Sequence, residues 1–143
     1  APGSTGGGAV TPARVATSPR MQAITTTTPP ALVHLTAPEL PAALAARGVT
    51  LLDFTAPWCA PCHALAPILG ELTATYAGRA RIAAIDVQDH PTVAQAFRVT
   101  SMPTLVLLRD GREVGRIVGL RARKVIVGAL DRALAGDVAI TGA

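Results

Sequence analysis

Hydrophobic and polar residues alternate with two different periods from residue 31 onward. Compact apolar runs, bounded by glycine, proline and polar turn residues, predict strands at 31–35, 50–55, 81–87, 104–108 and 113–118. Between them, apolar residues recur at the spacing of one helix face and predict helices at 36–47, 59–76, 91–97 and 121–135. The turn pair Asp110-Gly111 favours a tight hairpin between the last two strands.

The order of these elements predicts an α/β fold. Strands joined through helices are expected to be parallel, whereas the two strands of a hairpin must be antiparallel. We therefore expect a mixed five-stranded sheet, made of three parallel strands and an antiparallel hairpin, flanked by four helices. Thr36 and Glu39 form a capping-box pattern at the first helix, although Pro41 shifts the expected start by up to one turn. Pro67 predicts a kink in the second helix.

Residues 1–30 are rich in glycine, threonine, proline and serine and show no regular apolar period. Such a segment buries too little apolar surface to fold, so we predict a disordered leader followed by one domain at 31–143. Because the chain begins with Ala1, Met21 is a candidate internal start and residues 1–20 a candidate later addition.

The charge of the chain gives little support to nucleic-acid binding. The net charge is +4 over 143 residues, but Arg14 and Arg20 lie in the leader, and the rest carries eleven basic against nine acidic side chains. The dense basic cluster at 121–124 has no interleaved aromatic residues for stacking on bases. No apolar stretch reaches the roughly 20 residues of a membrane span, and no secretory signal is recognisable. We expect a cytoplasmic monomer without nucleic-acid or membrane partners.

Both cysteines lie in one hexapeptide, Trp58-Cys59-Ala60-Pro61-Cys62-His63. Two thiols at this spacing can form a disulfide and reopen it by thiol exchange, which carries two electrons to or from another protein. The same letters match half of a zinc site and, through the histidine, the attachment pattern of a c-type haem.

The rest of the chain disfavours both metal-based interpretations. A structural zinc site needs four ligands, and the three histidines, His34, His63 and His90, have no suitable pair spacing. Haem attachment, with Met102 as a second axial ligand, would require export and a helical wrapping that this strand-rich chain does not offer. We therefore expect no bound metal.

The predicted change from strand to helix gives the two thiols unequal roles. Cys59 would lie at a helix N-terminus, where the helix dipole and unpaired N–H groups stabilise a thiolate, and would be the exposed nucleophile. Cys62, one turn further, would be the shielded resolving thiol. Pro61 suits the first helical turn, because its missing N–H costs nothing there.

Further motifs follow in order along the chain: Leu65-Ala66-Pro67-Ile68-Leu69, Asp86-Val87, Met102-Pro103-Thr104-Leu105, Asp110-Gly111 and Val118-Gly119. Together with the segment from Asp53 to His63, they resemble the thioredoxin family over residues 31–136. The predicted order of strands and helices also agrees with the thioredoxin fold.

The resemblance implies a protein-disulfide reductase that needs no bound cofactor. The first cysteine of that family attacks a substrate disulfide, and the second resolves the mixed disulfide. A thioredoxin reductase, using NADPH, would reduce the protein again, and disulfide-containing proteins would be its clients. Asp53, an acid in an apolar strand, would take the proton of Cys62, since burial raises the pKa of a carboxyl toward neutrality. Met102-Pro103 would be the family's cis-proline loop.

The resemblance also implies a small apolar docking patch around the disulfide. Its members would be Trp58, Ala60, Pro61, Met102, Pro103, Gly119 and, at its edge, Leu120.

The chain departs from the family at three positions. Ala60-Pro61 replaces the usual Gly-Pro between the cysteines, which would shift the redox potential. His63 replaces a customary lysine, so its support of the Cys59 thiolate would depend on pH. Ala84 stands where many members carry a lysine near the buried acid, which would make Asp53 harder to ionise.

Two other functions remain open for a domain of this kind. An exported or specialised member of the family would oxidise or isomerise disulfides. A chaperone-like binding module would use the apolar patch and leave its cysteines idle.

Overall fold

The computed structural model describes residues 31–136 and 140–141. The strands are β1 (Val33–His34), β2 (Val49–Thr55), β3 (Ala80–Asp86), β4 (Thr104–Arg109), β5 (Arg112–Val118) and β6 (Ile140–Thr141). The helical segments are the 3-10 turn η2 (Ala37–Glu39) and the α-helices α2 (Leu40–Leu44), α3 (Ala60–Thr75), α4 (Pro91–Ala96) and α5 (Arg123–Ala135). The predicted disordered leader, residues 1–30, lies outside the described residues. No helix in the described part of the chain is long and apolar enough to cross a membrane.

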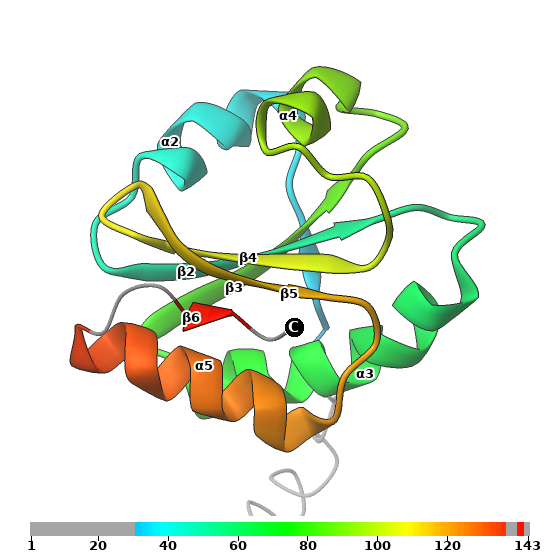
Figure 1. Ribbon diagram of the computed structural model, residues 1–143. Coiled ribbons are helices and arrows are strands. Elements are labelled where there is room, and N and C mark those ends of the chain that lie inside the picture. The colour runs from blue at the N-terminus through cyan, green and yellow to red at the C-terminus, as the bar shows by residue number, and fades with distance from the viewer. Residues whose placement is uncertain (1–30, 137–139, 142–143) are drawn as a thin grey trace, which may run out of the picture.

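The strands form one sheet in the order β1-β3-β2-β4-β5-β6 (Figure 1). β1, β3 and β2 are parallel, β4 is antiparallel to β2, and β5 is antiparallel to β4. The predicted mixed sheet of three parallel strands and a hairpin is therefore confirmed. β6, which is parallel to β5, adds a strand that the sequence did not predict, because two residues are too few to show a strand period.

The β4–β5 hairpin closes through the predicted turn pair. Asp110 and Gly111 both have positive φ angles, of 52° and 83°, as a two-residue type I′ turn requires. The Asp110 carboxylate accepts the N–H of Gly48 at 2.7 Å, and the Asp110 N–H donates to the carbonyl of Gly48 at 2.9 Å. The turn is thereby attached to the start of β2.

The alternation of side chains along β2 divides the core into two layers. Leu51 packs with α3 and α5 on one face of the sheet, and Leu52 and Phe54 pack with α2 and α4 on the other. Figure 1 shows these two pairs of helices on opposite sides of the sheet. Asp53 follows the alternation of Leu51 and therefore belongs to the face that α3 covers.

The N-terminal elements are shorter than predicted. The Glu39 carboxylate accepts the N–H and the hydroxyl of Thr36, at 2.8 and 2.9 Å, which confirms the capping box. The first turn is a 3-10 turn, however, and the α-helix ends at Leu44 rather than at 47. Pro41 lies in the first turn of α2, where its missing N–H is tolerated. α3 continues through Pro67 to Thr75.

Candidate active site

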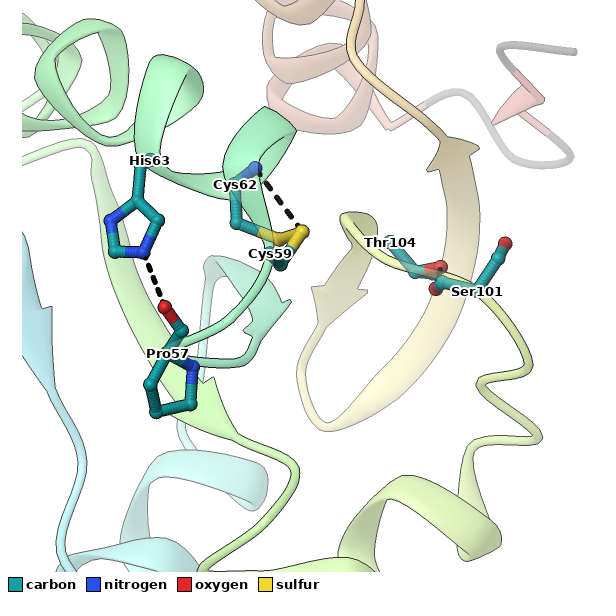
Figure 2. The surroundings of a disulfide bond; sticks show 6 residues. All are labelled: Pro57, Cys59, Cys62, His63, Ser101 and Thr104. Carbon is teal, nitrogen blue, oxygen red and sulfur yellow. Dashed lines mark hydrogen bonds between the residues drawn. A yellow bond between two sulfur atoms is a disulfide. The ribbon is translucent and has the colours of Figure 1, made fainter.

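The two cysteines form a disulfide where β2 leads into α3 (Figure 2). Their Cα atoms are 5.3 Å apart. Cys59 is the N-cap residue of α3, and its Sγ accepts the backbone N–H of Cys62 at 3.3 Å. Pro61 lies in the first turn of the helix. An N–H that points at Sγ, together with the helix dipole, would stabilise a thiolate on Cys59 after reduction.

The predicted exposure of Cys59 is not found in this disulfide form. Cys59 is 5% exposed and Cys62 is 2% exposed. Both cysteines pack against Ala56 and Met102 in a small cluster beside the main core. Sγ of Cys59 lies at the helix terminus, where it accepts the N–H of Cys62, and the two cysteines differ little in exposure in the disulfide form.

Asp53 lies in β2, buried between two apolar neighbours. Its partners across the sheet are Ala84 in β3 and Leu105 in β4, and its exposure is 1%. Its Oδ1 atom has no hydrogen-bond partner in the described part of the chain. Burial raises the pKa of Asp53 to about 7, because an ionised carboxyl loses its hydration there. The group can therefore take up or release a proton near neutral pH.

A cavity of about 260 Å³ joins Asp53 to Cys62. Its walls come from β1, β2, β3, the loop that follows β2 and α3. The lining residues are Leu32, His34, Asp53, Thr55, Ala56, Pro57, Cys62, His63, Ala66 and Asp86. The structure thus brings the predicted acid and the second cysteine to one cavity, although they make no direct hydrogen bond.

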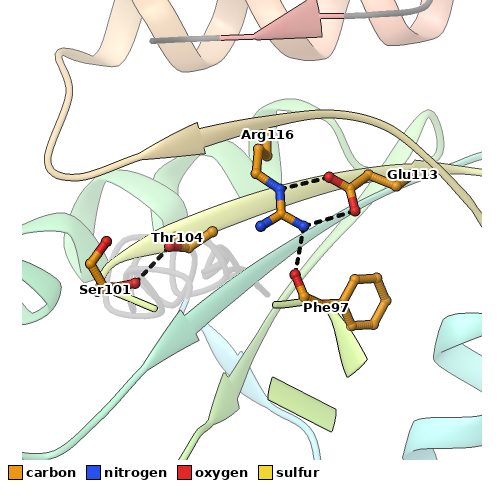
Figure 3. A network of polar contacts seen from close by, with 5 residues as sticks. All are labelled: Phe97, Ser101, Thr104, Glu113 and Arg116. Atoms are coloured by element: carbon orange, nitrogen blue, oxygen red, sulfur yellow. Dashed lines mark hydrogen bonds and ion pairs between the residues drawn. The ribbon is translucent and has the colours of Figure 1, made fainter. Parts of the chain in front are cut away.

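The bond between Met102 and Pro103 is cis, in the loop before β4. The hydroxyl of Thr104 donates to the carbonyl of Ser101 at 2.6 Å, and this hydrogen bond spans the loop (Figure 3). The N–H of Gly119 donates to the carbonyl of Pro103 at 2.8 Å. Since Met102 also packs against the disulfide cluster, the loop after β5 and the cis-proline loop are held together beside the cysteines.

Several apolar side chains near the disulfide face solvent. Trp58 is 63% exposed and Leu120 is 45% exposed, while Ala60 and Pro61 are exposed at the start of α3. Val118 is 42% exposed at the end of β5. Val118 was not among the predicted site residues. Two features of the sequence could have indicated Val118. It precedes Gly119, and it ends β5, whose partner strand β4 begins just after the cis-proline loop.

A second network attaches α4 to the hairpin away from the disulfide. The guanidinium of Arg116 binds both carboxylate oxygens of Glu113, at 2.7 and 2.9 Å, and donates to the carbonyl of Phe97 at 2.7 Å (Figure 3). Phe97 also packs against Phe54, with ring centroids 5.5 Å apart. These contacts stabilise the face of the sheet opposite α3.

His63 lies at the rim of the cavity and is exposed. Its Nε2 is 2.7 Å from the carbonyl oxygen of Pro57 (Figure 2). A carbonyl can only accept, so Nε2 carries the hydrogen and Nδ1 is the basic nitrogen of the neutral ring. The predicted influence of His63 on the Cys59 thiolate stays a prediction.

Two cavity residues, His34 and Asp86, were not predicted as part of the site. From the sequence, His34 was a candidate only for binding a metal. Its position in the cavity depends on how β1 aligns with β3, which no local pattern indicates. Among the described residues, no group of three or more histidine, cysteine or acidic side chains could hold a metal ion.

Comparison with known proteins places this arrangement among thioredoxins. The family model described as thioredoxin matches residues 31–132. The thioredoxin of Staphylococcus aureus is 42% identical over 87 residues, which cover 61% of this chain and 84% of that protein.

Solved structures give the same result. The oxidized form of mitochondrial thioredoxin 3 from Saccharomyces cerevisiae has a TM-score of 0.63 and 31% identity, and the match covers 70% of this chain and 93% of the other. A mutant thioredoxin from Halobacterium salinarum has a TM-score of 0.63 and 34% identity, with coverage of 73% and 90%.

Proposed function

The chain belongs to the thioredoxin family, and from this premise we propose that it acts as a reductant of disulfides in other proteins. It has the thioredoxin fold, and with its Cys59–Cys62 pair it is a thiol-disulfide oxidoreductase. The observation that carries the mechanism is the shared cavity. A buried acid and the second cysteine face the same space behind a disulfide at a helix N-terminus.

The reaction has two exchange steps. After reduction of the site, the thiolate of Cys59 attacks a client disulfide, forms a mixed disulfide and releases one client thiolate. Cys62 then gives its proton to Asp53, and the resulting thiolate attacks Sγ of Cys59. The second client thiolate leaves, the Cys59–Cys62 disulfide forms again, and both client sulfurs take up protons. Two electrons pass to the client.

The apolar patch around the disulfide would bind the client chain. Its exposed or partly exposed members are Trp58, Ala60, Pro61, Met102, Val118, Gly119 and Leu120, whereas Pro103, also predicted for the patch, is buried. Exposed aromatic and aliphatic side chains beside a reactive pair give a docking surface with little charge preference of its own.

The family requires no bound cofactor. A thioredoxin reductase that uses NADPH would return the electrons, and we place the protein in the cytoplasm as a monomer.

Reduction of insulin, with NADPH and a thioredoxin reductase as electron source, tests the proposal. Wild-type protein should support turnover, and Cys59→Ser should abolish it. In Cys62→Ser, mixed disulfides through Cys59 should accumulate with client proteins. Turnover without such trapping would contradict the two-step exchange, and the absence of both would favour a non-redox binding module.

A measured reduction potential separates a reductant from an oxidant of the same fold. A value near those of cytosolic reductants, about −270 mV, is expected. A strongly oxidising value, near about −120 mV, would contradict the proposed direction.

A further inference from the structure

Three residues on neighbouring parallel strands lie in one row across the sheet. Ala84 in β3 pairs with His34 in β1 on one side and with Asp53 in β2 on the other. Side chains at paired positions point to the same face of a sheet. His34 and Asp53 therefore lie on the same face, the one that α3 covers, with the methyl group of Ala84 between them.

Ala84 is fully buried and places only a methyl group between its two neighbours. Two strand spacings separate the backbones of His34 and Asp53 by about 10 Å. Both side chains line the same cavity of about 260 Å³. A water molecule takes about 30 Å³ of liquid, so this space is large enough for water to bridge an imidazole and a carboxyl.

Asp53 needs a path for its proton. It is 1% exposed, and its Oδ1 has no hydrogen-bond partner in residues 31–136. In the proposed reaction it takes a proton from Cys62 in each turnover and must lose it before the next. His34, by contrast, is exposed on an edge strand and so reaches both the cavity and the solvent.

We propose that His34 carries the proton between Asp53 and the solvent, through the cavity that both side chains line. The inference rests on the proposed function, in which Asp53 accepts the proton of Cys62. His34 affects the reaction only through Asp53, so it supports the catalytic residues and is not one of them.

The proton balance is complete. The Cys62 thiol gives its proton to the Asp53 carboxylate as the Cys62 thiolate attacks Cys59. Protonated Asp53 passes a proton through water to the neutral ring of His34, and the charged ring then releases a proton to the solvent. Asp53 returns to its carboxylate form, and His34 returns to its neutral form. An imidazole suits this task, because its ordinary range of titration lies near neutral pH.

Other titratable groups also face the cavity. α3 contributes Cys62 and His63, and β3 contributes Asp86. Nε2 of His63 is bonded to Pro57, and Oδ1 of Asp86 accepts the N–H groups of Gln88 and Asp89 at 2.7 and 3.4 Å. Among the residues described, the ring of His34 makes no hydrogen bond, and it shares its row with Asp53. This placement distinguishes His34 from His63.

The first test follows the titration of Asp53 by NMR in the oxidised protein. The carboxyl carbon of Asp53 should titrate in two coupled steps, one of which also appears at the His34 ring. In His34→Gln it should titrate in one step. His90→Gln removes a histidine outside the cavity and should leave both steps unchanged. An identical Asp53 titration curve in wild type and His34→Gln would overturn the proposal.

The second test measures single-turnover reduction of a client disulfide between pH 6 and 8. His34→Gln should slow the step in which Cys62 resolves the mixed disulfide by about 3-fold to 10-fold, a small part of the 10² to 10⁴ of direct acid–base catalysis. In His34→Ala, added imidazole should restore much of the rate. A purely structural role would give no rescue.

The two tests fail separately. If wild-type protein does not reduce disulfides, the proposed function is wrong, while the NMR titration still decides whether His34 is coupled to Asp53. If wild-type protein reduces disulfides and His34→Gln does so at the same rate without imidazole sensitivity, the role of His34 is wrong.

Discussion

At the scale of single residues, the burial of Asp53 makes its ionised form unfavourable and thereby raises the pKa of its carboxyl. A carboxylate without compensation is unfavourable inside a protein, so the group keeps its proton to a higher pH. The pKa of Asp53 rises to about 7 for this reason. The same burial that penalises the ionised form therefore prepares a proton acceptor for a neighbouring thiol.

The first prediction concerns stability and pH. Between about pH 4 and pH 7 the unfolded chain has lost the Asp53 proton, from its ordinary pKa of 3.8, whereas the folded protein keeps it until about 7. Folding therefore takes up a proton, and stability that is fully present below pH 4 falls as the pH rises through 7. Three pH units at about 1.36 kcal/mol each give about 4 kcal/mol.

Asp53→Asn cannot ionise and should lack this contribution. The variant should exceed the wild type in free energy of unfolding at pH 8, by on the order of 2–4 kcal/mol, and the advantage should shrink toward pH 4. Urea unfolding of both oxidised proteins at several pH values measures the difference. A difference that does not change with pH would refute the buried, protonated state of Asp53.

The second prediction concerns activity. Asp53→Asn cannot accept the proton of Cys62, so insulin reduction should fall near pH 7 by at least about 10-fold, and by up to the roughly 10² to 10⁴ that general acid–base catalysis contributes. The rate should recover partly toward pH 9, where a thiol ionises without help. Equal activity of variant and wild type from pH 6 to pH 8 would rule out the role of Asp53.

At the scale of secondary-structure elements, local chemistry determined what the sequence could predict. The hairpin was predicted correctly, because Asp110-Gly111 carries its turn type in two letters. The predicted helix at 36–47 was too long, because its apolar spacing continues past Leu44 while the structure leaves the helix there. The strand β6 was missed, since its pairing with β5 depends on tertiary contact rather than on a local pattern.

The third prediction separates the conformational cost of a turn from its packing. Gly111 and Gly78 both have a φ angle of 83°. A Cβ on Gly111 would lie 3.2 Å from the carbonyl oxygen of Leu44, whereas a Cβ on Gly78 would have no atom within 4 Å. Gly78→Ala should therefore cost about 1–2 kcal/mol from the left-handed backbone alone.

Gly111→Ala should cost about 1 kcal/mol more than Gly78→Ala, because the hairpin must move away from the end of α2. Thermal or urea unfolding of the two variants gives the comparison directly. Equal losses would mean that the turn does not pack against α2 as described.

At the scale of the whole molecule, the site is assembled from segments far apart in the sequence. The cysteine pair and the acid could be found from sequence, because each is conspicuous within a few letters. The cavity could not be found from the sequence, since it depends on strand register. This register places His34, Ala84 and Asp53, which lie on three different strands, in one row. Strand register between distant segments is a property of the assembled sheet.

The last prediction tests whether the assembled surface, rather than the disulfide alone, selects proteins as substrates. Trp58 is 63% exposed beside Cys59 and should bind a client chain without taking part in electron transfer. Trp58→Ala should raise KM for insulin several-fold, as loss of about 1 kcal/mol of aromatic contact implies, while the rate with a small disulfide changes by less than about 2-fold.

Val33→Ala is the matched control, since Val33 is 51% exposed on β1, on the opposite face of the sheet from His34. It should change neither KM nor the rate with the small disulfide. An equal loss with both substrates in Trp58→Ala would show that the ring supports the disulfide itself, because a docking contact affects only substrates large enough to reach it.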